Sequence, residues 1–201
     1  MGCPVTEPAG PTGVSLSLRE SVPDWAALRG RAITFASITV TESLNWVDDG
    51  CAEQLAHALD AGVHAGIRHL ARQGGAVDQA RHVVRAGAPL GAFAPGVLAP
   101  TLDARAAGID DRFVKTWIKT LRGEAGIRRV LVQAEFEDWQ HRFHPDKWAD
   151  SDVVLWLVRR NGIPGRPGWF HSRLGLHQHS SRTLAPESAL VYPFTLADVL
   201  L

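Results

Sequence analysis

The sequence predicts an α+β fold, in which a helical N-terminal half packs on a small, mainly antiparallel C-terminal sheet of four to five strands. Three observations lead to this class. Up to about residue 125 the apolar residues recur with the 3.6-residue period of helices. From Ile127 onward they alternate with the two-residue period of strands. The length of 201 residues, 45% of them hydrophobic, is that of one domain with its own core.

The first elements follow an N-terminal segment that is rich in proline and glycine. Residues 1–14 are interpreted as a disordered leader, so the single domain is expected to span 15–201. A short helix is predicted to end at Gly30. The β-branched run from Arg31 to Val40 then predicts a strand, which would raise the sheet to five strands.

A long helix dominates the middle of this half. Asn45–Asp49 offers N-cap residues, and the helix is predicted to run to about Gln73, where two glycines follow. Its apolar residues are spaced close to the helical period. The remaining elements are predicted to be a helix over 77–85, a loop over 87–100, a short helix over 101–108 and a helix over 110–123.

The C-terminal part is predicted to form the sheet. The strands expected there are 127–136, 153–160, 169–179 and 188–194. The segment 161–168, NGIPGRPG, carries glycine and proline at turn positions, so it is interpreted as the loop of a hairpin. The second and third strands would then be antiparallel neighbours.

Composition limits the classes of function. The formal net charge is zero, which speaks against a general nucleic-acid or membrane surface. The two cysteines lie far apart and match no disulfide framework or zinc knuckle. No apolar run reaches the ~18 residues of a membrane span, and the N-terminus lacks the pattern of a signal peptide. We therefore expect a cytoplasmic protein, and its bias toward arginine, alanine and glycine indicates a bacterial source.

The strongest functional pattern is an alternation in the segment Trp169–Arg182, WFHSRLGLHQHSSR. If this segment is a strand, its apolar residues point to one side and its basic residues to the other. The basic residues are His171, Arg173, His177 and His179. Such a face is either a site for chemistry or a solvated sheet surface.

A metal site is one interpretation of this face. His177 and His179 lie on the same side with Cα atoms ~6.7 Å apart, so both imidazoles can reach one zinc or non-haem iron ion. His171 lies about 20 Å away along an extended strand. A third ligand is therefore expected from Glu135, Glu137, His141 or His144 in the segment EFEDWQHRFH, and Glu137 is the preferred candidate.

A second metal interpretation starts from His144-Pro145-Asp146. This tripeptide has the His-x-Asp spacing of a 2-His-1-carboxylate iron site. A later histidine, His171 or His177, together with Arg182 would complete the usual set. The spacing to His171 is short for the fold that commonly carries such sites, so the His177 and His179 pair is preferred.

Histidine can also act without a metal, as a general acid or base near neutral pH. The candidate catalytic residues are His141, His144, His171 and Arg173. An anionic substrate group would be bound by arginine forks beside an aromatic ring. The candidate substrate-binding residues are Arg160, Arg166, Trp169 and Arg182.

We expect from these features an enzyme that acts on a small anionic substrate through histidine acid–base chemistry or a histidine-bound zinc or iron. An alternative is a non-enzymatic binding module that uses the loop 87–100 and the seven tryptophans. A weaker alternative is nucleic-acid binding through the arginine-rich hairpin, which the zero net charge disfavours. The chain matches no phosphate-loop, dinucleotide-binding or serine-hydrolase motif, and no family is assigned.

Overall fold

The computed structural model describes residues 10–17, 20–22, 24–180 and 185–201. In this part of the chain the strands are β1 (Thr12–Leu16), β2 (Ile33–Glu42), β3 (Trp46–Val47), β4 (His64–Leu70), β5 (Thr101–Asp103), β6 (Val130–Glu135), β7 (Val153–Val158), β8 (Leu174–Gln178) and β9 (Glu187–Leu190). The α-helices are α1 (Trp25–Gly30), α2 (Cys51–Asp60), α3 (Ala76–Gly87), α4 (Asp111–Ala125) and α5 (Phe136–His141). Short 3-10 helices cover Ala88–Leu90, Pro145–Lys147 and Leu196–Asp198.

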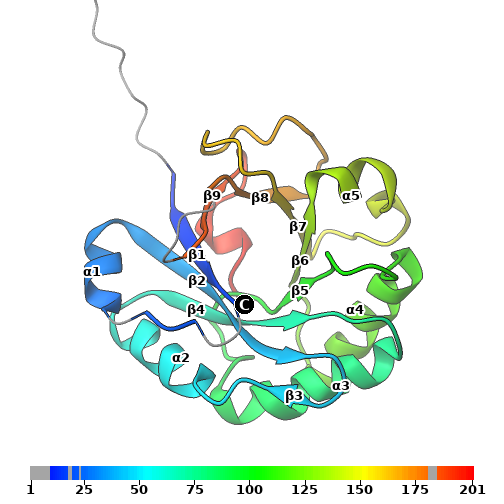
Figure 1. Cartoon of the computed structure of the whole chain (residues 1–201), viewed down its shortest axis with the longest axis horizontal. Helices are drawn as coiled ribbons and strands as arrows, with labels where there is room; N and C mark the ends of the chain where they lie inside the picture. Colours follow the sequence, from blue (N-terminus) through cyan, green and yellow to red (C-terminus); the bar gives the residue numbers. More distant parts are fainter. Residues whose placement is uncertain (1–9, 18–19, 23, 181–184) are drawn as a thin grey trace, which may run out of the picture.

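The strands of the described chain close into a barrel. Neighbouring strands follow the order β1-β9-β8-β7-β6-β5-β4-β2-β3, and β1 also pairs with β2. This last pairing joins the two ends of the sheet, so eight strands form the ring and β3 lies outside it, on β2 (Figure 1). The ring pairs are parallel except for those that β9 makes with β1 and β8.

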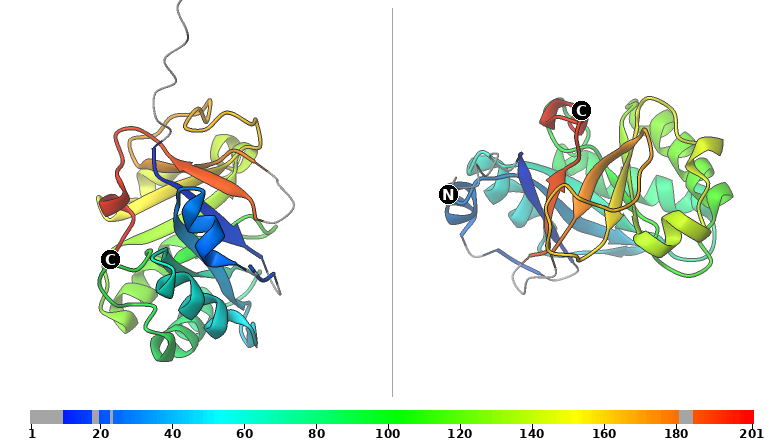
Figure 2. Two further views of the ribbon diagram at one scale, coloured as in Figure 1. Left: turned by 90° about the vertical axis from the view of Figure 1, so that its left-hand side faces the viewer. Right: turned by 90° about the horizontal axis from the view of Figure 1, so that it is seen from above.

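Helices lie on the outside of the barrel, as Figures 1 and 2 show. Helices α1, α2 and α3 pack on β2, and α3 packs beside α4. Residues 159–173, which join β7 to β8, contain no helix. Among the described residues, no helix combines the length and the apolar character that crossing a membrane requires.

Apolar side chains form one layer inside the barrel and another between the barrel and the helices. The outer layer includes Leu55 of α2 and Trp117 and Leu121 of α4, all buried. Inside the barrel, Phe35 and Trp156 meet edge to face with ring centroids 6.4 Å apart. This inner apolar layer fills the amino-terminal part of the barrel, so the lumen is a packed core.

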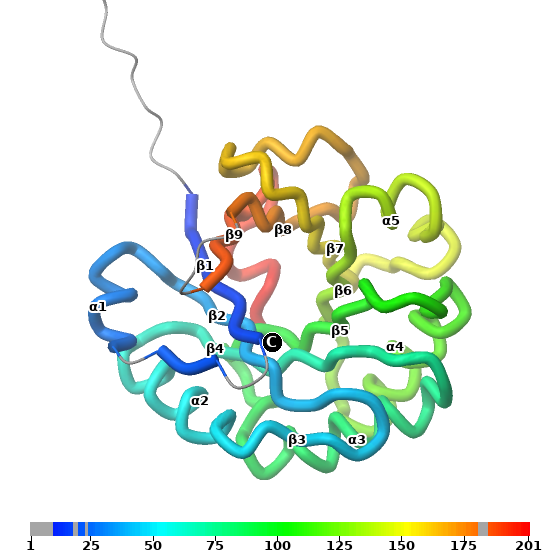
Figure 3. The backbone as a smooth tube through the Cα atoms, viewed as in Figure 1, coloured from blue at the N-terminus to red at the C-terminus, as the bar shows by residue number. Residues whose placement is uncertain are grey.

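The last residues of the chain close the amino-terminal end of the barrel. The backbone N–H of Ala99 donates to the Val199 carbonyl (2.9 Å), and that of Gly96 donates to the Leu201 carbonyl (2.8 Å). Val199 is buried in the inner apolar layer. The backbone tube in Figure 3 shows the C-terminus near β4 and β5 in this view. The opposite end of the barrel, where the parallel strands finish, is called the mouth below.

The predicted α+β class with a mainly antiparallel sheet is wrong, because the strands form a closed and mostly parallel barrel. All six residues of β7, VVLWLV, are buried, since one face of the strand points into the barrel and the other lies under covering segments. The β7–β8 pair is parallel. Residues 161–168 are therefore part of a connection that runs from the mouth back to the amino-terminal end, and not a hairpin loop.

Four strands lie where the sequence predicted none, and one of them is β3, in the segment predicted to begin the long helix. β4 occupies the end of the predicted long helix, since α2 already ends at Asp60, before Gly62 with its φ of +76°. β5 lies within the short helix predicted over 101–108. β1 begins at Thr12, inside the segment interpreted as a leader, and residues 1–9 of that segment lie outside the described part of the chain.

Candidate active site

The half of the barrel interior next to the mouth is polar. Arg68 of β4 is buried there, and its guanidinium donates to the Thr39 hydroxyl (2.9 Å), the Gln133 side-chain oxygen (3.3 Å) and the Leu16 carbonyl (2.7 Å). The Gln133 amide in turn donates to Oε1 of Gln178 (3.1 Å). A hydrogen-bonded polar layer thus extends from β1 to β8 and separates the apolar core from the mouth.

Arg68 places a permanent positive charge in this layer. Burial lowers the pKa of Arg68 to about 10, and the negative charge of Asp103 opposes that shift. A guanidinium with this pKa is still protonated at neutral pH. The buried cation therefore favours anionic groups at the neighbouring strand ends.

Asp103 ends β5, and Arg105 binds both of its carboxylate oxygens. Arg105 donates from Nε to Oδ1 (2.9 Å), from Nη2 to Oδ2 (2.6 Å) and from its backbone N–H to Oδ1 (3.2 Å). The Asp103 side chain is only 5% exposed. Burial alone would raise the pKa of Asp103, but the hydrogen bonds and charge of Arg105 hold that pKa below its usual value. Asp103 is therefore an ionised and covered carboxylate.

Arg105 also connects Asp103 to the next strand. Its Nη1 lies 3.4 Å from Oε1 of Glu135, the last residue of β6. Glu135 accepts two further hydrogen bonds from Arg160, from Nη2 to Oε1 (3.0 Å) and from Nη1 to Oε2 (3.2 Å). We call this chain of ion pairs, Asp103–Arg105–Glu135–Arg160, the rim network. It spans the mouth ends of β5, β6 and β7.

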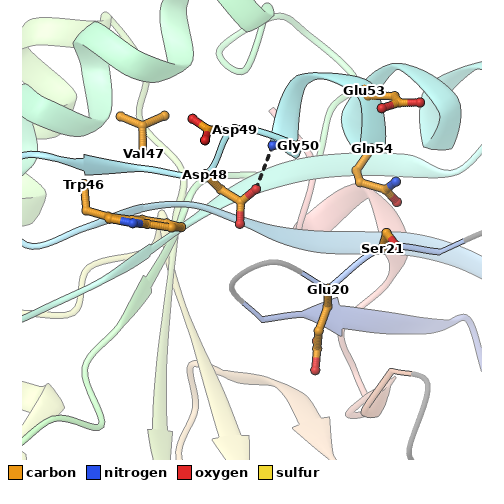
Figure 4. Close-up of a pocket in the computed structure, with 9 residues that line it drawn as sticks. All are labelled: Glu20, Ser21, Trp46, Val47, Asp48, Asp49, Gly50, Glu53 and Gln54. Carbon is orange, nitrogen blue, oxygen red and sulfur yellow. Dashed lines mark hydrogen bonds between the residues drawn. The ribbon is translucent and has the colours of Figure 1, made fainter.

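A cavity of about 370 Å³ borders the mouth on the side of β1 and β2 (Figure 4). Cavities of about 300–1,000 Å³ are the usual size for ligand sites. Trp46 of β3 lines one side, and Asp48 accepts the N–H of Gly50 (2.9 Å) where α2 begins. Glu20, from the segment after β1, and Glu53 of α2 contribute further carboxylates. The cavity therefore combines an indole ring with several hydrogen-bond acceptors.

His177 and His179, the predicted metal pair, lie on the outer side of the barrel. Leu176 and Gln178 face the interior, so the alternation of β8 turns the histidines outward. Their ring centroids are 6.1 Å apart, and His177 Nε2 contacts the Arg159 carbonyl (2.9 Å). The nitrogens His177 Nδ1 and His179 Nε2 are buried without a hydrogen-bond partner among the described residues. Burial lowers the pKa of both rings.

The predicted metal ligands do not assemble into a site. Glu137 is exposed on α5, and the described residues hold no group of three or more His, Cys, Asp or Glu side chains placed to bind an ion. Two imidazoles alone fall short of the three protein ligands of catalytic zinc sites. The ligands of the alternative iron site do not converge either. His171 Nε2 contacts Asp146 (3.1 Å), whereas His144 pairs with Asp111 (2.9 Å).

Two of the predicted catalytic residues lie at the amino-terminal end of the barrel, away from the mouth. His171 and Arg173 come just before β8, which begins at Leu174. Arg173 donates to the carbonyl of Val153 (2.9 Å) and to that of Ser151, at the start of β7. Most of β8 therefore lies between this pair and His177. Arg173 connects the segment before β8 to the start of β7.

The remaining predicted residues are mostly on the outer surface. His141 and Arg166 are exposed, and Trp169 stacks on a tryptophan of α5 with centroids 5.7 Å apart. Arg182 lies outside the described residues. Arg160 does reach the mouth, where it belongs to the rim network.

Asp103, Arg105 and the cavity around Trp46 were not predicted from the sequence. A signal for Asp103 does exist, since it is the polar end of the run Thr101-Leu102-Asp103. Polar residues at the carboxyl ends of parallel barrel strands are typical of active sites. Asp103 was not recognised as a strand end because the sequence predicted a helix over 101–108. A strand of three residues is too short to show a two-residue period.

Comparisons with known proteins agree with the barrel. The model of glycosyl hydrolases family 25 matches residues 16–188. The bacterial lysozyme from Streptomyces coelicolor shares 17% sequence identity, with 96% of each chain covered and a TM-score of 0.78. The family GH25 lysozyme from Aspergillus fumigatus shares 17% identity over 93% of this chain and 96% of its own, with a TM-score of 0.75. The modular autolysin LytC from Streptococcus pneumoniae shares 13% identity over 89% of this chain and 46% of its own, with a TM-score of 0.71. No curated protein sequence matches this chain.

These comparisons correct the predicted function. The hypothesis of an enzyme for small anions that works through histidines or a histidine-bound metal is wrong. The expectation of an enzyme is confirmed in its coarser form, as membership of a family of glycosyl hydrolases. Because the family model matches residues 16–188, which is well over half of the chain, the chain belongs to glycosyl hydrolases family 25.

Proposed function

We propose that this chain acts on peptidoglycan and binds the sugar strand of that polymer at the mouth of the barrel. The family assignment supports a glycan as the ligand. Similar structures include muramidases and lysozymes, and the structure of the autolysin LytC holds a synthetic peptidoglycan ligand. The expected partner is therefore a polymer instead of a small molecule.

The observation that carries this proposal is the cavity beside the mouth, with Trp46 as its aromatic side. An indole ring offers an apolar face on which a pyranose ring can pack, and its polar edge tolerates water. The carboxylates of Glu20, Asp49 and Glu53 offer acceptors for sugar hydroxyl and amide groups. In barrels of this type ligands bind where the parallel strands end, and the cavity lies at that end.

Hydrolysis of the glycosidic bond is the second part of the function to consider. Glycoside hydrolysis commonly uses two carboxyl groups about 5–9.5 Å apart, one as acid and one as base or nucleophile. Asp103 and Glu135 are the candidates, because they end neighbouring strands and share the Arg105 guanidinium. Two carboxyl groups are therefore present at neighbouring strand ends, but both are held in ion pairs with arginine.

Binding is tested by co-sedimentation with insoluble peptidoglycan. We expect Trp46→Ala to weaken binding roughly tenfold, which corresponds to about 1.4 kcal/mol. Phe170→Ala is the matched control, since Phe170 is an aromatic residue that is 80% exposed on the β7–β8 connection, away from the cavity. Equal binding by wild type and both variants would place the glycan elsewhere, and absence of sedimentation for wild type would contradict the proposal.

The cytoplasmic location expected from the sequence stays a prediction. Intact peptidoglycan lies outside the cytoplasmic membrane, so action on it there requires export of the protein. Fractionation of cells that produce the protein distinguishes the two locations.

A further inference from the structure

We infer that Arg105 holds Asp103 and Glu135 in an ion-paired state in which the mouth binds a sugar strand without cleaving it. The inference rests on the proposed binding of peptidoglycan and concerns the chemistry that follows binding. It assigns Arg105 as the positioning residue that separates recognition from hydrolysis.

Arginine engages every oxygen of the two carboxylates. Asp103 Oδ1 accepts from Nε of Arg105 (2.9 Å), and Asp103 Oδ2 accepts from Nη2 (2.6 Å). Glu135 Oε1 accepts from Arg105 (3.4 Å) and Arg160 (3.0 Å), and Glu135 Oε2 accepts from Arg160 (3.2 Å). The Asp103 side chain is 5% exposed under this cover. A glycosidic oxygen can therefore reach Asp103 only after Arg105 has moved away.

The two-carboxylate reaction needs a proton that this arrangement does not supply. In that reaction a protonated carboxyl gives its proton to the glycosidic oxygen while the bond from that oxygen to the anomeric carbon breaks. In the inverting form, water then adds its hydroxyl group to the anomeric carbon and gives its proton to the second carboxylate. A carboxylate held by a guanidinium is ionised, in agreement with the lowered pKa of Asp103. The guanidinium itself keeps its proton.

Other carboxylates near the mouth could supply the missing proton only if they are not already paired. Glu42, at the end of β2, is paired with Arg72 (2.6 Å), and Glu187, at the start of β9, lies 3.3 Å from Arg31. Glu20 accepts the backbone N–H of Ser17 and lines the cavity. Asp49 and Glu53 line the same cavity, and Glu20 is the alternative acid that the experiment includes.

The experiment measures binding and cleavage on the same samples of purified, insoluble peptidoglycan. Co-sedimentation gives the bound fraction, and new reducing ends in the supernatant and pellet give the bonds cleaved. The proteins are wild type, Asp103→Asn, Glu20→Gln, Arg105→Gln and the control Arg81→Gln. Arg81 pairs with Glu124 between α3 and α4 on the outer surface, so its loss removes an arginine without touching the mouth.

We expect wild type to sediment with peptidoglycan and to release no reducing ends above a heat-inactivated sample. We expect the same of Arg81→Gln. Release of reducing ends by wild type would overturn the inference, and loss of that release in Asp103→Asn or Glu20→Gln would identify the acid. Failure of wild type to sediment would contradict the proposed function instead.

A second measurement tests the role of Arg105 independently of the glycan. Carbon-13 NMR of the Asp103 carboxyl follows its titration in wild type and in Arg105→Gln. We expect the pKa of Asp103 to rise by about one unit or more when the guanidinium is removed. Arg105→Lys keeps the charge but loses the two-pronged geometry, so if it replaces an Arg105→Gln variant that does not fold, the expected rise in the pKa of Asp103 is smaller. An unchanged Asp103 titration would refute the assigned role, whatever the binding result.

Discussion

His69 illustrates how the packing around one side chain fixes its protonation state. This buried histidine of β4 accepts a hydrogen bond at Nδ1 from the Thr41 hydroxyl (2.9 Å), while its Nε2 lies 3.0 Å from Oε1 of Gln79. The same Oε1 accepts the N–H of Arg72, and the Gln79 amide donates to the Arg72 carbonyl, so Oε1 is an acceptor. Nε2 therefore carries the proton. Burial lowers the pKa of His69 to about 4 and keeps the ring neutral.

We predict that this histidine makes the fold acid-sensitive. The folded pKa of about 4 lies below the unfolded value of about 6.5, so the unfolded chain binds more protons between these pH values. The free energy of unfolding should therefore fall as the pH drops from 6.5 toward 4, by an amount on the order of 3 kcal/mol. Urea unfolding at pH 7 and pH 4.5 measures this loss in wild type and in His69→Gln. A loss of equal size in both proteins would contradict the assignment.

The ion pair of Asp103 and Arg105 should also show in stability. Arg105→Ala leaves a covered carboxylate without its partner, and we expect a loss of about 2–3 kcal/mol in the free energy of unfolding. In the double variant Asp103→Ala/Arg105→Ala the orphaned charge is gone, so the coupling energy of the cycle should reach about 1–3 kcal/mol. The exposed pair Arg81 and Glu124 is the matched control, with a coupling of at most about 0.5 kcal/mol. Equal coupling energies at both pairs would show that the ion pair of Asp103 and Arg105 is no stronger than an exposed ion pair.

Among the elements, β4 depends most clearly on the absence of a side chain. Gly66 faces the segment before β5, and a Cβ atom at this position would overlap the carbonyl group of Leu98. Leu98 also bridges to Leu200 in the segment that closes the amino-terminal end. A glycine in this strand therefore lets the closing segments contact the barrel wall.

We predict opposite effects for two glycine substitutions. Gly66→Ala should lower the free energy of unfolding by about 1–3 kcal/mol, because the added methyl group displaces backbone. Gly123→Ala, in α4, meets open space and should raise the free energy of unfolding by about 0.5–1 kcal/mol, because alanine favours the helix. Urea unfolding measures both. A neutral Gly66→Ala would show that the closing segment is not packed as described.

At the scale of the whole molecule, the sequence predicted where several elements lie but not how the strands are arranged. Several elements were predicted close to their bounds, such as the strand over 31–40, now β2 (Ile33–Glu42), and the helix over 110–123, now α4 (Asp111–Ala125). Periodicity reports which residues are buried, but it does not report which strands are neighbours. The unbroken apolar run of β7, covered on both faces, was the available sign of a parallel barrel.

The site was harder to predict than the elements, for a related reason. The rim network joins the ends of β5, β6 and β7, so its members become neighbours only when these three strands pair side by side. The histidine-rich segment could be predicted as a site because its residues are close together in the sequence. Strand alternation and the direction of β8 then place His177 outside the barrel and His171 at the far end. Arg160 was predicted to bind substrate as part of a hairpin that does not exist; the structure places it at the mouth, paired with Glu135, and its role in binding stays a prediction.

The place of glycan binding can be read from amide chemical shifts of the isotope-labelled protein titrated with a soluble peptidoglycan fragment. We predict that the shifts concentrate at the mouth, around Trp46, Arg105 and Arg160, and that they saturate with one affinity. Shifts concentrated around Arg173 at the amino-terminal end of the barrel, or none at a saturating concentration, would contradict the account.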